Sequence, residues 1–270
     1  MASDGFFSAF AAVIPALFLA AGVYIYAALV RQIRVRGVER PAAPVREFGW
    51  PEATLAIFLV LLFLYGMAVS ASRDVRRIQT PDLLESTLLS IGLLLFVAAF
   101  LRLRRFNLNL LGGFSKVGFG RAVTTGGILL LAAYPLVLLA EVVTQKLSHG
   151  TLEKQGIIEL FNASATLEQR VLIILIAVAV APLAEEFFFR FFLYGVLKRY
   201  FGRGIGIVTN AMLFAAVHAH LPSFAALFVL GVCFTIAYEW SGSLLVSMTM
   251  HALFNALALT ALAFPEVIPQ

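Results

Sequence analysis

The sequence predicts an all-α, polytopic integral membrane protein with about eight transmembrane helices. Hydrophobic residues make up 61% of its 270 residues, charged residues make up 13%, and the mean hydropathy is +0.94. A soluble domain of this composition would expose too much apolar surface to water. Cys233 is the single cysteine, which excludes an intramolecular disulfide and a cysteine metal cluster.

Eight apolar stretches are each near the ~20 residues that a helix needs to cross a hydrocarbon core of ~30 Å. The first lacks the positively charged start of a signal peptide, and the basic run RQIRVR follows it. We therefore expect this first span to be an uncleaved membrane anchor. The expected spans are residues 6–30, 51–72, 84–101, 122–143, 169–197, 204–220, 222–240 and 243–263.

Lysine and arginine are distributed unevenly over the connections between these spans. Thirteen of the 20 basic residues lie in the odd-numbered connections and six lie in the even-numbered ones, whereas Arg190 lies within a span. This bias predicts that the odd-numbered connections are cytoplasmic and that both termini are outside. The net charge of +5 then follows from topology and from affinity for anionic membrane lipid, and it requires no nucleic-acid partner.

The fifth expected span contains the stretch APLAEEFFFRFFLYG (residues 181–195), which places two glutamates and an arginine in an apolar helix. Each such charge costs roughly 2.5 to 3.5 kcal/mol at the centre of a membrane helix unless a partner offsets it. Glu186 and Arg190 are four residues apart and can form an ion pair on one helical face. Glu185 has no basic residue three or four positions away, so we expect its partner to come from another helix.

Three further polar side chains lie deep in the later spans, namely His218, His251 and Asn255. The spacing places Phe214 and His218 on one helical face, and His251 and Asn255 on another. A single histidine within a membrane helix is usually structural, but two histidines, an amide and an unpaired carboxylate on three helices favour a functional cluster. Amide hydrolysis needs such a set, because it requires a base beside a water and donors directed at the developing oxyanion.

Two neighbouring residues carry separate expectations. Pro182 has no amide hydrogen and, in an α-helix, frees the carbonyl of Val178 one turn before the glutamates. Glu239 lies near the tight connection between the last two spans, where we expect its carboxylate to be solvated.

Three motifs give the chain a family resemblance. EEFFFR (185–190), FAAVH (214–218) and HALFN (251–255) match, in order and helical placement, the EExxxR, FxxxH and HxxxN motifs of the CAAX-protease and bacteriocin-processing family. Its members are intramembrane endopeptidases related to the type II CAAX prenyl endopeptidase, and the resemblance covers about residues 120–265. It implies a protease core at residues 111–270, preceded by N-terminal transmembrane helices with basic loops at residues 1–110.

The resemblance also implies a role for each motif residue. Glu185 is expected to be the general base that activates water, with His218 as its co-activator. His251 and Asn255 are expected to stabilise the oxyanion, and Glu186 and Arg190 to orient Glu185. This implies a glutamate-type peptidase without a cofactor. Its substrate is expected to be a membrane-associated or lipidated peptide or protein with a C-terminal CAAX-like or a bacteriocin-like sequence.

Other functions fit the same residues. A glutamate and two histidines are also the ligands of a hydrolytic zinc site, so a zinc-dependent intramembrane metalloprotease is the first alternative. The metal-free hypothesis is favoured because it also uses Glu186, Arg190 and Asn255, which zinc leaves unexplained. A proton-coupled transporter and a non-catalytic immunity protein are further alternatives, although neither needs an oxyanion pair.

The expected location is a prokaryotic inner (plasma) membrane. Glu185 lies in the inner half of its span, and His251 lies about 10 residues beyond the cytoplasmic seventh connection. We therefore expect the active site to open toward the cytoplasm.

Overall fold

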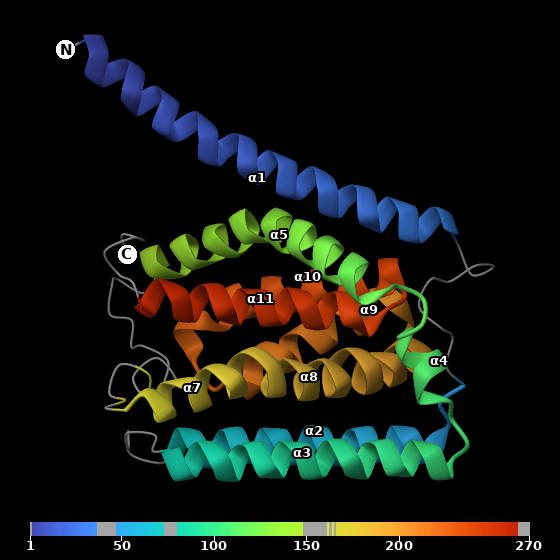
Figure 1. The fold of residues 1–270 in the computed structure, drawn as a ribbon. Coiled ribbons are helices and arrows are strands. Elements are labelled where there is room, and N and C mark those ends of the chain that lie inside the picture. The colour runs from blue at the N-terminus through green and yellow to red at the C-terminus, as the bar shows by residue number, and fades with distance from the viewer. Residues whose placement is uncertain are drawn as a thin grey trace.

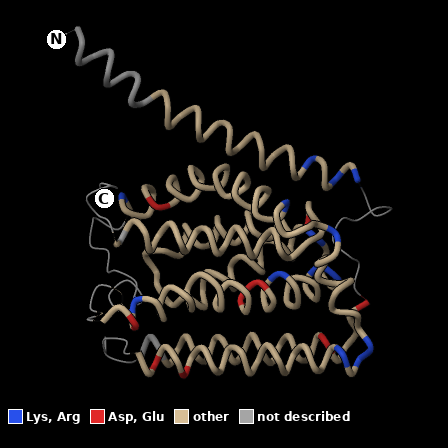
Figure 2. The backbone as a smooth tube through the Cα atoms, viewed as in Figure 1, with Lys and Arg blue, Asp and Glu red and all other residues tan. Residues whose placement is uncertain are grey.

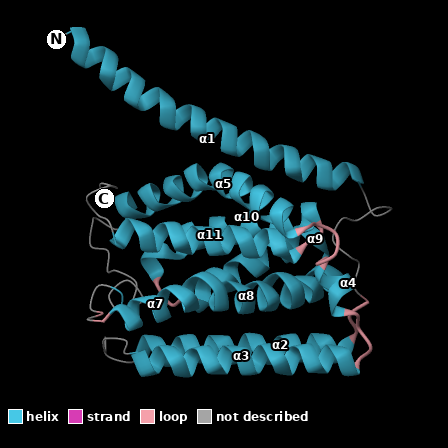
Figure 3. Ribbon diagram, viewed as in Figure 1, coloured by secondary structure: helices cyan, strands magenta, loops and turns pink. Residues whose placement is uncertain are grey.

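The computed structural model describes residues 2–36, 47–72, 80–147, 161, 164 and 166–263. Helices are the only regular structure in these ranges (Figure 3), which confirms the all-α prediction. They are α1 (Ala2–Arg36), α2 (Trp50–Ser72), α3 (Thr80–Leu103), α4 (Leu108–Gly112), α5 (Phe119–Leu147), α7 (Leu167–Leu175), the π-helical η1 (Ile176–Val180), α8 (Ala181–Glu186), the π-helical η2 (Phe187–Leu193), α9 (Tyr194–Val217), the 3₁₀ turn η3 (Leu221–Ser223), α10 (Phe224–Ser241) and α11 (Leu244–Ala263).

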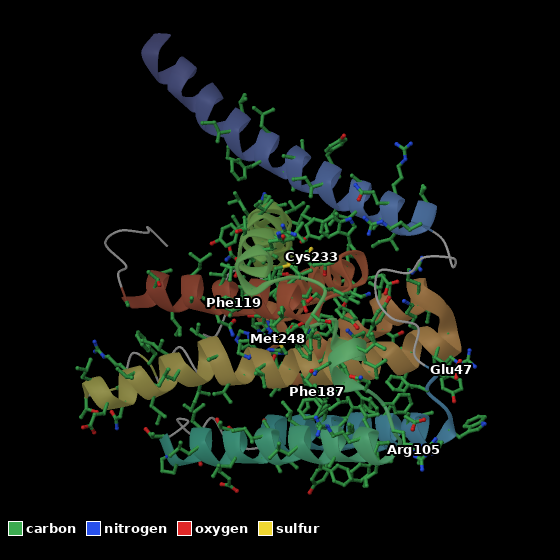
Figure 4. The ribbon with its side chains drawn as sticks, turned by 45° about the vertical axis from the view of Figure 1, so that its right-hand side comes forward. Glu47, Arg105, Phe119, Phe187, Cys233 and Met248 are labelled. Carbon is green, nitrogen blue, oxygen red and sulfur yellow. The ribbon has the colours of Figure 1, made fainter. Side chains whose placement is uncertain are left out.

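The helices form a stack of layers with the motif-bearing helices in its middle (Figure 1). Helix α1 lies obliquely on one side and is followed by α5, then by α10 and α11, then by α7 and α8. The pair α2 and α3 closes the opposite side. Side chains fill the space between these layers (Figure 4), and those of Phe187 and Cys233 are buried there.

Seven helical stretches in the described ranges are long and apolar enough to cross a membrane, whereas the sequence predicts eight spans. Six of the seven correspond to single predicted spans. The other runs over 51 residues, from Leu167 to Val217, and contains both 169–197 and 204–220. A straight helix of that length would measure about 76 Å at 1.5 Å per residue, far more than a bilayer core.

The chain reverses direction within this long stretch, at Gly202. Gly202 has φ 80° and ψ 172°, a conformation that interrupts the helix and suits glycine. A Cβ on Gly206 would lie 3.1 Å from the backbone nitrogen of Lys198, and the Arg190 guanidinium lies 4.2 Å from the centre of the Phe214 ring. The stretch is therefore a helical hairpin that passes through the bundle twice, and the seven stretches correspond to eight passes.

Small residues allow the central helices to pack closely. A Cβ on Gly22 of α1 would collide with the carbonyl oxygen of Ala132 in α5. A Cβ on Gly126 of α5 would lie 2.9 Å from Cβ of Thr249 in α11. Such close backbone approach drives helix association in lipid, where the hydrophobic effect between helices is absent.

The described helix ends that border the odd-numbered connections carry most of the described basic residues and gather at one end of the bundle, which we call the basic end (Figure 2). Arg36 Nη1 donates to the carbonyl oxygen of Trp240 at 2.9 Å, and Arg203 Nη1 donates to that of Ile33 at 3.4 Å. These bonds join the first, fifth and seventh connections. The first turn of α1 and the last turn of α11 lie at the other end (Figure 1).

Glu239 lies at the basic end, and the expectation that its carboxylate is solvated was wrong. Its side chain is buried and accepts from Lys198 Nζ at 2.7 Å, from Arg203 Nε at 2.8 Å and from the Tyr194 hydroxyl at 3.0 Å. These donors come from the α9 hairpin, which packs against α10. The burial therefore depends on a helix–helix contact that sequence spacing does not reveal.

Candidate active site

The helix that carries Glu185 and Glu186 changes its hydrogen-bonding pattern just before them. In the π-helical η1, the amide of Ala181 donates to the carbonyl oxygen of Ile176, five residues earlier. With the same spacing, the carbonyl of Ala177 would need the amide of Pro182, which has no hydrogen. Asn255 Nδ2 of α11 donates to this carbonyl oxygen instead, at 2.8 Å.

The hydrogen bond from Asn255 changes the expectation for Pro182 and gives Asn255 a structural role. The carbonyl that receives a side-chain donor is that of Ala177, rather than that of Val178 as expected for α-helical spacing. The affected carbonyl shifts by one residue because hydrogen bonds join residues five apart in a π-helix and four apart in an α-helix. Asn255 therefore joins α11 to the irregular turn that precedes the glutamates.

Glu186 forms a buried ionic cluster with residues of two helices. Arg190 Nη1 donates to Glu186 Oε1 at 2.9 Å, as the spacing of four residues predicts, and both side chains are fully buried. His251 Nδ1 lies 3.0 Å from the same oxygen. Glu186 thus links its own helix to α11 and orients the ring of His251.

Aromatic rings and a carbonyl surround the guanidinium of Arg190. Its carbon atom lies 4.2 Å from the centre of the Phe214 ring and 5.1 Å from that of Phe234, and Nη2 donates to the carbonyl oxygen of Gly231 at 3.4 Å. Ring faces attract a desolvated cation. Together with the Glu186 ion pair, they offset the cost of burying this charge.

Glu185 differs from its neighbour because its carboxylate faces a cavity. Its side chain is 30% exposed, and its Oε2 lies 3.8 Å from Nε2 of His218 and 3.8 Å from Nε2 of His251. Among the residues described, Oε2 has no hydrogen-bond partner. The structure therefore brings Glu185, His218 and His251, each from a different predicted span, to one point.

The partners of the two histidines determine which ring nitrogen faces Glu185 with a lone pair. His218 Nδ1 lies 2.7 Å from the carbonyl oxygen of Phe214, which can only accept, so Nδ1 carries the hydrogen. His251 Nδ1 faces the Glu186 carboxylate in the same way. In their neutral forms, both histidines therefore present an Nε2 lone pair toward Glu185, and they donate from Nε2 only as imidazolium.

A cavity of about 580 Å³ adjoins this point. Glu185, His218, His251 and Asn255 line it, together with residues of α2, α3 and α5 that carry no motif. The lining residues of α3 lie between 83 and 93 and those of α5 between 134 and 141. All of these except Leu93, which lies at the middle of α3, are in the helix halves away from the basic end.

The position of the cavity bears on two expectations from the sequence. The sequence predicts a cytoplasmic basic end and also a site that opens toward the cytoplasm. The cavity extends from the catalytic side chains into the opposite half of the bundle, which favours an opening away from the basic end. The conflict arises because residue counts along single spans do not show which neighbouring helices enclose the cavity.

Sequence reasoning missed the contributions of α3 and α5 to the cavity. The hydroxyl side chains of Ser86, Thr87 and Ser90 on α3 line it, as does Glu141 on α5. The available signal was three hydroxyl residues at helical spacing, and one carboxylate, in otherwise apolar spans. Phe234, which packs beside Arg190 and His251, carried no signal that separates it from the other phenylalanines.

Comparison with known proteins agrees with the motifs. Residues 167–257 match the family described as "Type II CAAX prenyl endopeptidase Rce1-like". The chain is 34% identical over 88 residues to the "Uncharacterized protein YpbD" of Bacillus subtilis (strain 168); the match covers 31% of this chain and 42% of that protein, so the chain spans less than half of the relative's length. No solved structure matches significantly. All three motifs lie within the matched segment, so residues 167–257 are similar to the Rce1-like family of CAAX-type endopeptidases in the part of the chain that carries the candidate site.

Proposed function

We propose that the protein is a glutamate-type intramembrane endopeptidase in which Glu185 activates a water molecule. The observation that carries this proposal is the approach of Glu185 Oε2 to two Nε2 atoms, at 3.8 Å each, beside a cavity. A separation of 3.8 Å is too long for a direct hydrogen bond. The three atoms nevertheless converge, as a carboxylate and two imidazoles that share one water molecule must.

In this mechanism Glu185 takes a proton from the water as the water oxygen attacks the carbonyl carbon of the peptide bond. The resulting tetrahedral intermediate carries its negative charge on the former carbonyl oxygen. Glu185 then returns the proton to the amide nitrogen as the C–N bond breaks. One water is consumed, and the products are a carboxylic acid and an amine.

The neighbouring residues support these steps. His218 helps to hold the water against Glu185. His251 stabilises the oxyanion by donating from Nε2, and Glu186 holds the ring in place through Nδ1. Asn255 is the second donor in this proposal, and its amide also anchors the turn at Ala177.

For the membrane topology, we propose a prokaryotic plasma-membrane protein with a cytoplasmic basic end and both termini outside. The cavity is then reached from the outer half of the membrane, which replaces the expected cytoplasmic opening. The substrate is a membrane-associated or lipidated peptide of CAAX-like or bacteriocin-like type. A membrane-impermeant peptide should be cleaved by right-side-out vesicles and not by inverted ones; the reverse result would restore the cytoplasmic opening.

The catalytic proposal is tested with the full-length protein purified in detergent. A panel of fluorogenic peptides, with and without a lipidated cysteine, is compared for the wild type, Glu185→Ala and His218→Ala. Glu85→Ala is the matched control, because Glu85 is an exposed glutamate of α3 that does not line the cavity. Loss of hydrolysis in the two site variants alone supports the mechanism, whereas hydrolysis by Glu185→Ala rules it out.

The zinc-dependent alternative uses the same three side chains, although within the described residues no group of three or more His, Cys, Asp or Glu side chains is placed to hold a metal ion. The carboxylate of Glu185 and two Nε2 lone pairs converge, and Glu186 orients His251 as an outer partner of a metal-bound histidine would. Their separations of 3.8 Å exceed the roughly 3.4 Å between ligands of tetrahedral zinc. Loss of hydrolysis with a chelator, followed by rescue with zinc, would establish the metalloenzyme.

A further inference from the structure

Helix α10 carries none of the three motifs, yet one of its turns contacts the candidate site. Gly231, Phe234 and Thr235 are buried on this turn. The carbonyl oxygen of Gly231 accepts from Arg190 Nη2 at 3.4 Å and from Thr235 Oγ1 at 2.8 Å. A Cβ on Gly231 would lie 3.2 Å from Cδ1 of Phe214, so the absence of a side chain permits a close approach. This turn of α10 is therefore part of the surroundings of the catalytic side chains.

The Phe234 side chain completes a group of three rings in mutual contact. Its ring centre lies 5.1 Å from that of His251 at an interplanar angle of 31°, and 6.3 Å from that of Phe214 at 68°. The centre of the Phe214 ring in turn lies 5.8 Å from that of His251 and 4.8 Å from that of His218. At these separations aromatic rings attract one another. The three rings therefore support one another in the middle of the bundle.

A single hydrogen bond does not by itself fix the plane of an imidazole ring. His251 Nδ1 lies 3.0 Å from Glu186 Oε1, which holds one edge of the ring and leaves a pivot about that contact. Packing against the ring removes this freedom. Phe234 packs at 31° to the imidazole plane and Phe214 at 82°. The direction of His251 Nε2, which lies 3.8 Å from Glu185 Oε2, therefore depends on the two phenylalanines.

We propose that Phe234 is a positioning residue, which holds the His251 ring so that Nε2 faces Glu185. The same phenylalanine packs beside Arg190, the other partner of Glu186, and so supports both contacts of that carboxylate. Phe234 does not line the cavity, so it acts on the reaction only through its neighbours. The inference rests on the proposed peptidase function, in which His251 stabilises the oxyanion.

The kinetic test uses full-length protein in detergent and the fluorogenic peptide that the wild type cleaves best. Phe234→Leu keeps an apolar side chain but removes the ring plane, so we expect kcat per folded molecule to fall by about tenfold while KM stays within about twofold. Phe234→Met fills more of the same space without a ring and should behave in the same way. Phe234→Tyr keeps the ring and should retain kcat per folded molecule within about threefold.

Phe192→Leu is the matched control for the loss of a buried ring. Phe192 is as fully buried as Phe234, packs against Phe48 and does not line the cavity. Its replacement should lower the melting temperature to a similar extent but leave kcat per folded molecule unchanged. An equal fall in kcat in both leucine variants, no fall in Phe234→Leu, or a Phe234→Tyr variant as impaired as Phe234→Leu overturns the positioning role.

The mobility of the His251 ring tests the inference without any hydrolysis. The chain has four histidines, so protein labelled with ¹³C in its histidine rings gives few signals, and a His251→Gln variant assigns the relevant ones. We expect the order parameter of the His251 ring C–H bonds to fall from about 0.85 toward about 0.6 in Phe234→Leu and to stay unchanged in Phe192→Leu.

These measurements distinguish the inference from the proposed function. A His251 ring that becomes mobile in Phe234→Leu, with a wild type that cleaves no peptide, would keep the positioning role and reject the peptidase. A His251 ring that stays rigid in Phe234→Leu would overturn the positioning role, and hydrolysis by the wild type would then leave the peptidase standing.

Discussion

The molecule contains two buried carboxylate clusters, and they differ in whether every oxygen is satisfied. At the basic end, both carboxylate oxygens of Glu239 accept hydrogen bonds, from Lys198, Arg203 and Tyr194. In the catalytic cluster, Oε2 of Glu185 and Oε2 of Glu186 have no hydrogen-bond partner among the residues described, and only the Glu185 side chain, which is 30% exposed, lines the cavity. A fully bonded carboxylate joins helices, whereas a carboxylate left open to a cavity is available for chemistry.

The largest expected difference is in activity and follows from Glu185. Glu185→Gln removes the proposed base but keeps the shape of the side chain, so kcat should fall by about 10²–10⁴-fold. The melting temperature in detergent should change by less than about 2 °C, because no hydrogen bond to Oε2 is lost. Peptide hydrolysis and thermal unfolding of the same preparation measure both. A large drop in melting temperature with unchanged activity per folded molecule would instead give Glu185 a structural role.

The next largest effect separates orientation from stability within the catalytic cluster. Glu186→Leu leaves Arg190 buried without its carboxylate, which should destabilise the protein by about 3–5 kcal/mol. Activity should also fall, by about 10–100-fold, because His251 loses the group that orients it. The double variant Glu186→Leu/Arg190→Met removes both charges and should recover most of the stability but not the activity. Recovery of activity as well would show that Glu186 does not orient His251.

Glu239 should have a smaller effect on stability and none on chemistry. In Glu239→Leu, Lys198 and Arg203 lose their partner, but their side chains are 18% and 29% exposed and can be hydrated. We expect a loss of about 1–3 kcal/mol with unchanged kcat in the folded fraction, as measured by thermal unfolding and hydrolysis. A fall in kcat would mean that the basic end is coupled to the catalytic cluster.

The smallest predicted effect concerns the bond between Asn255 and the carbonyl of Ala177. Asn255→Ala should cost about 1 kcal/mol by removing one interhelical hydrogen bond within the membrane. Adding Pro182→Ala restores an amide that can satisfy the same carbonyl, so the double variant should regain stability. If Asn255 is an oxyanion donor, the double variant should remain impaired in kcat; full recovery of activity would restrict Asn255 to a structural role.

Much of the fold and part of the candidate site could be predicted from local sequence. The apolar lengths identified every helical pass, because each pass must satisfy its own backbone hydrogen bonds in lipid. The ion pair between Glu186 and Arg190 followed from their spacing of four residues. The missing partner of Glu185 within its own helix correctly indicated side chains from other helices.

The remaining features depend on how the helices cross. Spacing placed His251 with Asn255 on one face, but only packing determined that His251 contacts Glu186 while Asn255 caps the carbonyl of Ala177. The burial of Glu239 and the position of the cavity likewise require neighbouring helices that lie far away in the sequence.

By itself, the sequence determined the membrane class, the number of helical passes and the chemical groups that meet in the cluster, since these follow from composition and helical periodicity. Spacing paired Glu186 with Arg190, and the tertiary structure decided that this pair is fully enclosed while the Glu185 side chain lines a cavity. The physical reason is that Glu185 and Glu186 are adjacent and chemically identical, and they point about 100° apart around the helix axis. Arg190 and α11 enclose Glu186, while the two histidines leave space beside Glu185.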